Sequence, residues 1–131
     1  MKAIGSLKED LNIEKRISIT PETVKKFVEL NFSIFLEKNF GSHLGITDEE
    51  YASKGAKIVN TEKEVIEKSE IILKVNCPSS EQSNFIKNNS LLIGQFDSLS
   101  HQEIFNKLLK KGVKIFSLNL LPRITRAQSM D

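Results

Sequence analysis

Ile71-Ile72-Leu73-Lys74-Val75 is the stretch of the sequence that decides the fold. Four of its five residues are apolar, and they do not alternate with polar residues. A strand that is apolar on both faces is typical of a parallel sheet with helices covering both sides. A second run of this kind, Leu91-Leu92-Ile93-Gly94, follows after a short polar stretch. Both runs therefore predict strands buried inside one parallel sheet.

Short apolar runs alternate with helix signals along the whole chain. Each strong helix signal begins with a hydroxyl residue, followed by proline or by a glutamate three residues later. Strands that alternate with such helices predict a doubly wound α/β fold, Rossmann- or flavodoxin-like, with a mostly parallel sheet in one domain over residues 1–131. The expected strands are 3–7, 32–36, 57–59, 71–75, 91–94 and 113–117, and helix starts are expected at Thr20, Thr47, Thr61 and Ser100, with a weaker helix over 82–86.

The composition excludes several classes of protein. The net charge of +2 is too mild to indicate nucleic-acid binding. The longest apolar runs have about five residues, whereas a membrane span needs roughly 20. The start, Met1–Ile4, reads as a strand and not as a signal peptide. The single cysteine, Cys77, and the distant His43 and His101 do not form a zinc site, and Cys77 is expected to be unreactive. We expect the chain by itself to be soluble and cytosolic, without a metal.

The glycine-rich fingerprint of dinucleotide-binding domains is absent. It requires glycines in the pattern G-x-G-x-x-G after the first strand, where the backbone approaches the pyrophosphate. No two of the six glycines in the chain lie two residues apart. This domain is therefore not expected to hold a dinucleotide pyrophosphate in the Rossmann manner.

Arginine is rare in this sequence, and its positions point to a ligand site. There are three arginines against sixteen lysines, and two of the three lie in the final segment, 122–131. That segment follows the expected strand 113–117, and loops leaving the carboxyl ends of strands carry the ligand sites of open α/β sheets. Arg123, Gln128 and Asp131 supply a bidentate cation, an amide and an anion. This set suits a carboxamide-bearing group such as nicotinamide, or a carboxylate; a polar tail without a role is the alternative.

Two further cations occupy unusual positions. Arg16 lies between the first strand and the first helix, so its side chain reaches either the same crevice or the surface. Lys74 lies inside an apolar strand, where a lysine is costly unless it is paired or reaches a cleft. The alternatives for Lys74 are an ion pair or a ligand contact, and a strand-end lysine whose ammonium reaches water.

Four segments resemble the N-terminal domain shared by alanine dehydrogenases and the alpha subunit of proton-translocating NAD(P) transhydrogenase. They are Glu14–Pro21, Gly55–Val59, Ser69–Pro78 and Pro122–Asp131. The first three are common to both branches of this family, and the last is similar to the hallmark loop of transhydrogenases. Alanine dehydrogenases also use a histidine after the strand that matches 91–94. Residues 95–100 contain no histidine, and His101 belongs to the next helix start, so the transhydrogenase branch is favoured.

The resemblance implies roles for the candidate site residues. In transhydrogenases an Arg-Gln-Asp set contacts the dihydronicotinamide end of bound NAD(H), and it matches Arg123, Gln128 and Asp131. These residues are expected to orient the ring for hydride transfer to NADP⁺ on a separate domain, coupled to proton translocation. Such transfer requires the reacting carbons to lie within about 3–3.5 Å. In alanine dehydrogenases the residues that match Arg16 and Lys74 bind the carboxylate and carbonyl of pyruvate.

The resemblance also implies partners. The glycine-rich dinucleotide-binding domain of the family lies downstream of this loop. The chain is therefore expected to be the N-terminal subdomain of a longer NAD(H)-binding component, with 118–131 as a mobile loop, and alone to be inactive and free of cofactor. The expected partners are the downstream domain, the NADP(H)-binding and membrane components, and a second copy in a homodimer, peripheral to the inner membrane. The alternatives are the pyruvate-binding domain of an alanine dehydrogenase and a stand-alone module for small carboxylates.

Overall fold

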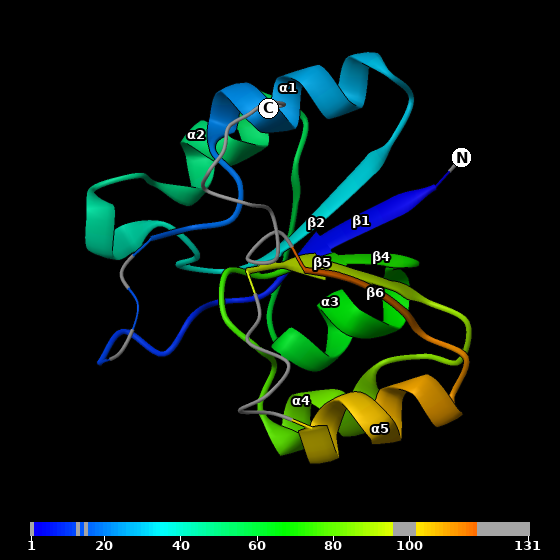
Figure 1. Ribbon diagram of the computed structural model, residues 1–131. Helices are drawn as coiled ribbons and strands as arrows, with labels where there is room; N and C mark the ends of the chain where they lie inside the picture. The colour runs from blue at the N-terminus through cyan, green and yellow to red at the C-terminus, as the bar shows by residue number, and fades with distance from the viewer. Residues whose placement is uncertain (1, 13, 15, 96–101, 118–131) are drawn as a thin grey trace, which may run out of the picture.

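The fold is a six-stranded sheet in which every described pair of neighbouring strands is parallel (Figure 1). The computed structural model describes residues 2–12, 14, 16–95 and 102–117. The strand order is β3-β2-β1-β4-β5-β6, so the predicted doubly wound α/β fold is confirmed. The strands are β1 Ala3–Ser6, β2 Ser33–Glu37, β3 Lys57–Val59, β4 Ile71–Leu73, β5 Leu91–Gly94 and β6 Lys114–Ser117.

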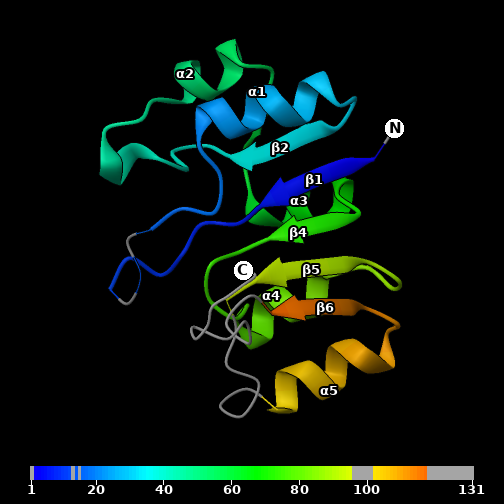
Figure 2. The same ribbon diagram turned by 45° about the horizontal axis from the view of Figure 1, so that its top comes forward.

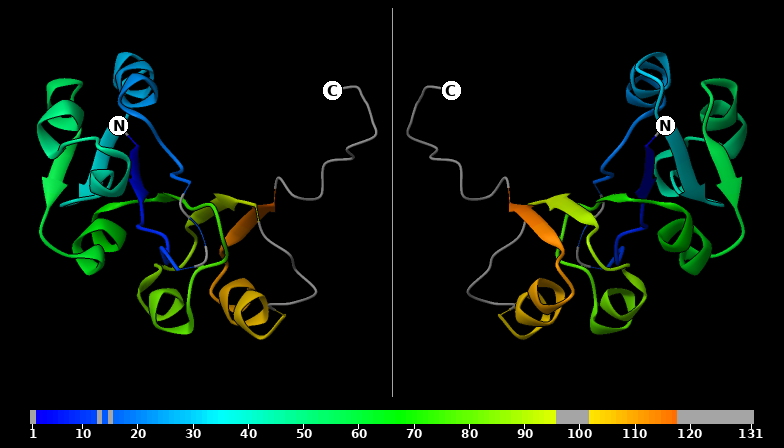
Figure 3. Two further views of the ribbon diagram at one scale, coloured as in Figure 1. Left: turned by 90° about the vertical axis from the view of Figure 1, so that its left-hand side faces the viewer. Right: turned by 90° about the vertical axis from the view of Figure 1, so that its right-hand side faces the viewer.

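Helices cover both faces of this sheet. α1 and α2 lie on one face, and α3, α4 and α5 lie on the other, as the edge-on views of Figure 3 show. Figure 2 shows β1 between β2 and β4, at the centre of the sheet. The helices are α1 Pro21–Glu29, α2 Asp48–Ser53, α3 Glu62–Lys68, α4 Ser80–Phe85 and α5 Gln102–Lys110, and a short 3-10 helix, Ser42–Leu44, precedes α2.

The predicted helix starts at the threonines are confirmed, and one cap was missed. The Thr20, Thr47 and Thr61 hydroxyls each accept a hydrogen bond from a backbone N–H of the first turn. Ser79 and Gln82 form a complete capping box, so α4 begins two residues before the predicted 82–86 helix. The predicted box had glutamate at its fourth position, whereas this one uses glutamine. Ser100 lies outside the described residues.

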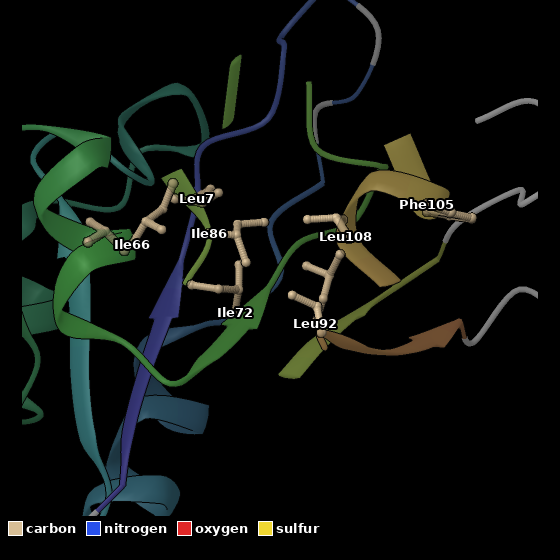
Figure 4. Close-up of a cluster of buried hydrophobic side chains, with 9 residues drawn as sticks. Leu7, Ile66, Ile72, Ile86, Leu92, Phe105 and Leu108 are labelled. Carbon is tan, nitrogen blue, oxygen red and sulfur yellow. The ribbon is translucent and has the colours of Figure 1, made fainter. Parts of the chain in front are cut away.

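β4 contributes apolar side chains to both layers. Ile72 is fully buried among the residues that α3, α4 and α5 cover, which include Ile66, Leu92 and Leu108 (Figure 4). Ile71 and Leu73 point the other way and pack against the cluster under α1 and α2. The strand ends two residues earlier than predicted, so Lys74 lies just beyond it. The apolar run at 71–73 therefore forms the two-sided strand that the sequence predicts.

The close packing of β1 on α3 depends on Gly5. A Cβ atom at this position would lie 2.6 Å from Val65 Cγ1 and would also collide with the Ser69 hydroxyl. Any side chain here would push α3 away from the centre of the sheet. Gly112 ends α5 with a φ of 78°, as the sequence predicts for a helix-ending glycine.

Lys111 fastens the end of α4. Its Nζ donates to the carbonyl oxygens of Ser83 at 3.1 Å, Asn84 at 3.1 Å and Ile86 at 3.0 Å. The last carbonyls of a helix lack partners inside the helix and lie at the negative end of its dipole. One lysine from the turn after α5 therefore satisfies three acceptors at the end of α4 and ties the two helices together.

We predict that Lys111→Met lowers the free energy of unfolding by about 1–3 kcal/mol, because three carbonyls lose a charged donor. Urea denaturation measures this change. Lys110→Met is the matched control: its side chain is exposed on α5, and its effect is expected to stay below about 0.5 kcal/mol. Equal losses in the two variants would contradict the role assigned to Lys111.

Candidate functional site

The candidate site lies where the carboxyl ends of β1, β4 and β5 meet. After β1 the chain builds β2 and β3 on one side, and it then returns to place β4 on the other side of β1. This reversal creates the crevice in which open α/β sheets bind ligands. The segments that follow these strands, 7–20, 74–79 and the residue Gln95, provide the side chains described below.

Lys74 is buried in an ion pair with Glu9. The Lys74 Nζ lies 2.8 Å from Glu9 Oε1, and the two side chains are only 5% and 2% exposed. Glu9 also accepts backbone N–H groups from Val75 at 2.8 Å and from Asn76 at 3.1 Å. Both carboxylate oxygens are therefore bonded, which a buried charge requires. Of the alternatives for Lys74, the structure supports the ion pair and not a side chain that reaches water.

Arg16 lies at the edge of the crevice, held by Glu14. Its Nε and Nη2 donate to the two oxygens of Glu14 at 2.7 and 2.9 Å, and its Nη1 donates to Gln95 Oε1 at 3.2 Å. The Arg16 side chain is 64% exposed, whereas Glu14 is 11% exposed. The hydrogen bonds from Arg16 hold the pKa of Glu14 down at about 2, and Glu14 raises the pKa of Arg16. Both groups are therefore fully charged at neutral pH.

A hollow of about 200 Å³ joins the two cations. Lys74 and Gln95, the acceptor of the Arg16 bond, both line it. Ser18 lines it as well, and its hydroxyl is hydrogen-bonded to the Ser6 hydroxyl. The remaining lining residues are Ile17, Leu73, Val75, Ile93 and Gly94. The structure therefore brings Arg16 and Lys74 to one crevice, although they lie far apart in the sequence.

A second, larger hollow lies at the other side of the ion pair. Its volume is about 580 Å³, and Glu9 and Lys74 both line it. Burial raises the pKa of Glu37 in its wall, and Glu62 raises it further. Burial also raises the pKa of Cys77 in this wall to about 11, so the thiol is protonated at neutral pH.

The Arg123, Gln128 and Asp131 set lies outside the described residues, as do His101 and the predicted loop 118–131. The strand that precedes this segment is described. In the parallel register of β5 and β6, Gly94 pairs with Ser117. The chain thus leaves β6 at the same edge of the sheet where Gln95 follows β5.

Two residues of this site were missed by reasoning from the sequence. Glu9 is 65 residues from Lys74, and no local spacing distinguishes it from the other acidic residues. The cost of burying Lys74 predicted that some carboxylate exists but not which one. Glu14 offered a local signal, because it lies two residues before the rare Arg16 in the same segment.

Two searches of the described residues gave no candidates. Within residues 2–95 and 102–117, apart from the undescribed positions 13, 15 and 96–101, no group of three or more His, Cys, Asp and Glu residues could hold a metal ion. No helix in this part of the chain is long and apolar enough to cross a membrane.

We predict that Lys74→Met lowers the free energy of unfolding by about 3–5 kcal/mol, because it leaves a buried carboxylate without its cation. The double variant Lys74→Met/Glu9→Gln is expected to lose less than the sum of the single variants. Urea denaturation measures both. The control is Lys2→Met, since the Lys2–Glu70 pair is 4.0 Å apart and exposed, and its loss is expected to stay below about 0.5 kcal/mol. A small effect of Lys74→Met would show that the pair is not coupled.

Proteins of two kinds are similar to this chain along most of its length. The first of the separate parts of NAD(P) transhydrogenase subunit alpha from Rickettsia prowazekii is 35% identical over 98% of the chain and 34% of that protein. The corresponding protein from Rhodospirillum rubrum is 32% identical over 90% of the chain and 32% of that protein. An alanine dehydrogenase from Methanococcus maripaludis is 36% identical over 84% of the chain and 30% of that protein. The chain spans about a third of the length of these relatives.

Solved structures give the same two neighbours. The crystal structure of transhydrogenase from Sinorhizobium meliloti matches with a TM-score of 0.87 and 31% identity over 99% of the chain and 39% of that protein. An L-alanine dehydrogenase matches with a TM-score of 0.85 and 26% identity over 94% of the chain and 34% of that protein. Residues 5–131 match the family described as "Alanine dehydrogenase/PNT, N-terminal domain". The chain therefore belongs to the alanine dehydrogenase/PNT N-terminal domain family.

Proposed function

We propose that this chain is the beginning of the NAD(H)-binding component of an NAD(P) transhydrogenase. The observation that carries the proposal is the segment Pro122–Asp131, which contains the Arg-Gln-Asp set of transhydrogenases. Its position in the sequence supports the assignment, since it follows β6, which ends beside β5 at the crevice edge. The relatives named as transhydrogenase alpha subunits support the same branch.

In this proposal the chain orients the nicotinamide end of NAD(H). Arg123, Gln128 and Asp131 offer a planar cation, an amide and a carboxylate, which together match the donors and acceptor of a carboxamide. The segment between β1 and α1 has no glycine, so the tight turn that cradles a pyrophosphate is missing. The rest of the cofactor would be bound by the downstream domain. When bound, NAD(H) supplies the hydride, and these residues contribute orientation.

The second candidate is the pyruvate-binding domain of an alanine dehydrogenase. The observation that favours it is the meeting of Arg16 and Lys74 at a hollow of about 200 Å³, which suits a small 2-oxo acid. The stretch after β5 speaks against it, because the histidine of alanine dehydrogenases is not found in residues 95–100. A stand-alone module for small carboxylates would use the same two cations.

The proposal includes the partners of the complete enzyme. They are the downstream dinucleotide-binding domain, the NADP(H)-binding and membrane components, and a second copy in a homodimer. The names of the relatives, which present their alpha subunit as divided into separate proteins, support such a division of the enzyme. The third of their length that this chain spans supports a further domain downstream. We place the assembled enzyme at the cytoplasmic side of the inner membrane. The isolated chain is proposed to be inactive and to bind no cofactor.

We predict that Arg123→Ala lowers hydride transfer from NADH to an NADP⁺ analogue by about a hundredfold in the enzyme assembled with its partner components, because the ring loses its orientation. Absorbance change of the NADP⁺ analogue measures the rate. The matched control is Arg126→Ala, which removes the neighbouring arginine outside the Arg-Gln-Asp set. Alanine-dependent reduction of NAD⁺ by the same enzyme would overturn the proposal in favour of the second candidate.

We predict that NADH up to millimolar concentration leaves the nitrogen-15 NMR spectrum of the isolated chain unchanged, because the downstream domain completes the site. Pyruvate is the comparison ligand, and it is likewise expected to leave the amides of Arg16, Lys74 and Gln95 unshifted. Specific shifts at Arg123, Gln128 and Asp131 with NADH would contradict the dependence on the missing domain. Shifts at Arg16 and Lys74 with pyruvate would support a carboxylate site.

A further inference from the structure

Glu14 has no role in the functions considered above, although it begins one of the segments that carry the family resemblance. Its carboxylate makes three bonds to one residue. Arg16 gives it the side-chain Nε at 2.7 Å, the side-chain Nη2 at 2.9 Å and the backbone N–H at 3.0 Å. Glu14 therefore fixes both the backbone and the side chain of Arg16.

The two partners differ in their exposure, and this difference is unlike an ordinary surface ion pair. The Glu14 side chain is 11% exposed and the Arg16 side chain is 64% exposed. The carboxylate is thus held close to the protein, while the guanidinium extends outward. Gln95, beyond the end of β5, accepts the third side-chain bond at 3.2 Å. Arg16 is therefore held from two sides, at the segment before α1 and at the end of β5.

The guanidinium keeps unused donors in this arrangement. Arginine has five N–H donors in a rigid planar fork. The described acceptors take the Nε donor, one on Nη2 and one on Nη1. One N–H on each terminal nitrogen is left without an acceptor among the described residues. These two groups are available to an oxygen atom of a ligand in the crevice.

The same segment treats the second cation in the same way. Glu9, which also lies between β1 and α1, binds the Lys74 ammonium at 2.8 Å. Lysine has three N–H donors, and Glu9 is the acceptor that the described residues provide. Each cation at the crevice thus has its own carboxylate from one segment, and each keeps donors for a ligand.

We propose that Glu14 is a positioning residue: it holds one edge of the Arg16 guanidinium so that the free N–H groups are presented to a carbonyl oxygen of the ligand in the crevice. A long side chain that is already ordered loses less freedom when a ligand binds. The ligand side of this inference rests on the proposed function. The carbonyl belongs either to the carboxamide of nicotinamide or to a 2-oxo acid.

The first test uses the chain without a ligand. Glu14→Gln keeps the shape of the side chain but removes its charge and one acceptor oxygen. The readout is the Arg16 Nε–H signal in nitrogen-15 NMR, identified by its loss in Arg16→Lys. We expect its exchange with water to become about fivefold faster, the upper end for an exposed ion pair, while the melting temperature stays unchanged. The control is Glu67→Gln, which changes an exposed glutamate of α3 and is expected to leave this signal unchanged.

Two results of this first test would overturn the inference. One is an Arg16 signal that Glu14→Gln does not alter, since Glu14 would then not hold the guanidinium. The other is a fall in melting temperature with shifts across the whole domain, which would identify Glu14 as a structural residue only.

The second test uses the enzyme assembled with its partner components. Glu14→Gln is expected to slow hydride transfer about fivefold, and to cause no further loss when Arg16 is already replaced by glutamine. An equal loss on both backgrounds would overturn positioning through Arg16. If pyruvate and alanine are turned over instead, the same comparison with those substrates identifies the carbonyl as that of a 2-oxo acid. The proposed function then fails, while the role of Glu14 is still decided by the NMR signal.

Discussion

The buried bond between Glu9 and Lys74 is the interaction on which the rest of the candidate site depends. It joins the segment after β1 to the segment after β4, the two neighbouring strands at which the chain reverses direction across the sheet. The carboxylate also binds two backbone N–H groups beyond β4. Replacing such a pair by apolar side chains is often neutral for stability, so stability alone does not account for it. Its other effect is to fix the walls of two hollows, both of which Glu9 or Lys74 lines.

Much of the fold could be predicted from the sequence because its signals are local. The two-sided apolar run at 71–73 and the threonine caps depend on residues within a few positions of one another, and the strands and helix starts they predicted are present. The errors were at boundaries: β4 ends before Lys74, and α4 begins at Ser80. In both places a side chain bonds across a short distance in space that hydrophobicity alone does not reveal.

The site was predictable only to a limited extent, because its bonds connect distant segments. The rarity of arginine and the cost of a buried lysine singled out Arg16 and Lys74, and the structure brings both to one crevice. Their partners Glu9, Glu14 and Gln95 carry no distinguishing pattern of their own. The segment 122–131 could be interpreted only through its resemblance to transhydrogenases, since its residues lie outside the described region of the chain.

The central position of β1 also has a kinetic consequence. Its register with β4 pairs Ile4 with Ile71, and the Ser6 hydroxyl reaches a carbonyl 67 residues away. Closing so long a loop costs entropy before any of its contacts form, and folds that depend on distant pairings fold more slowly than those with local contacts. β1, α1 and β2 form a local unit, whereas the crevice exists only after β4 has docked. The residues that recognise a ligand are thus assembled by the step of folding that spans the greatest distance along the chain.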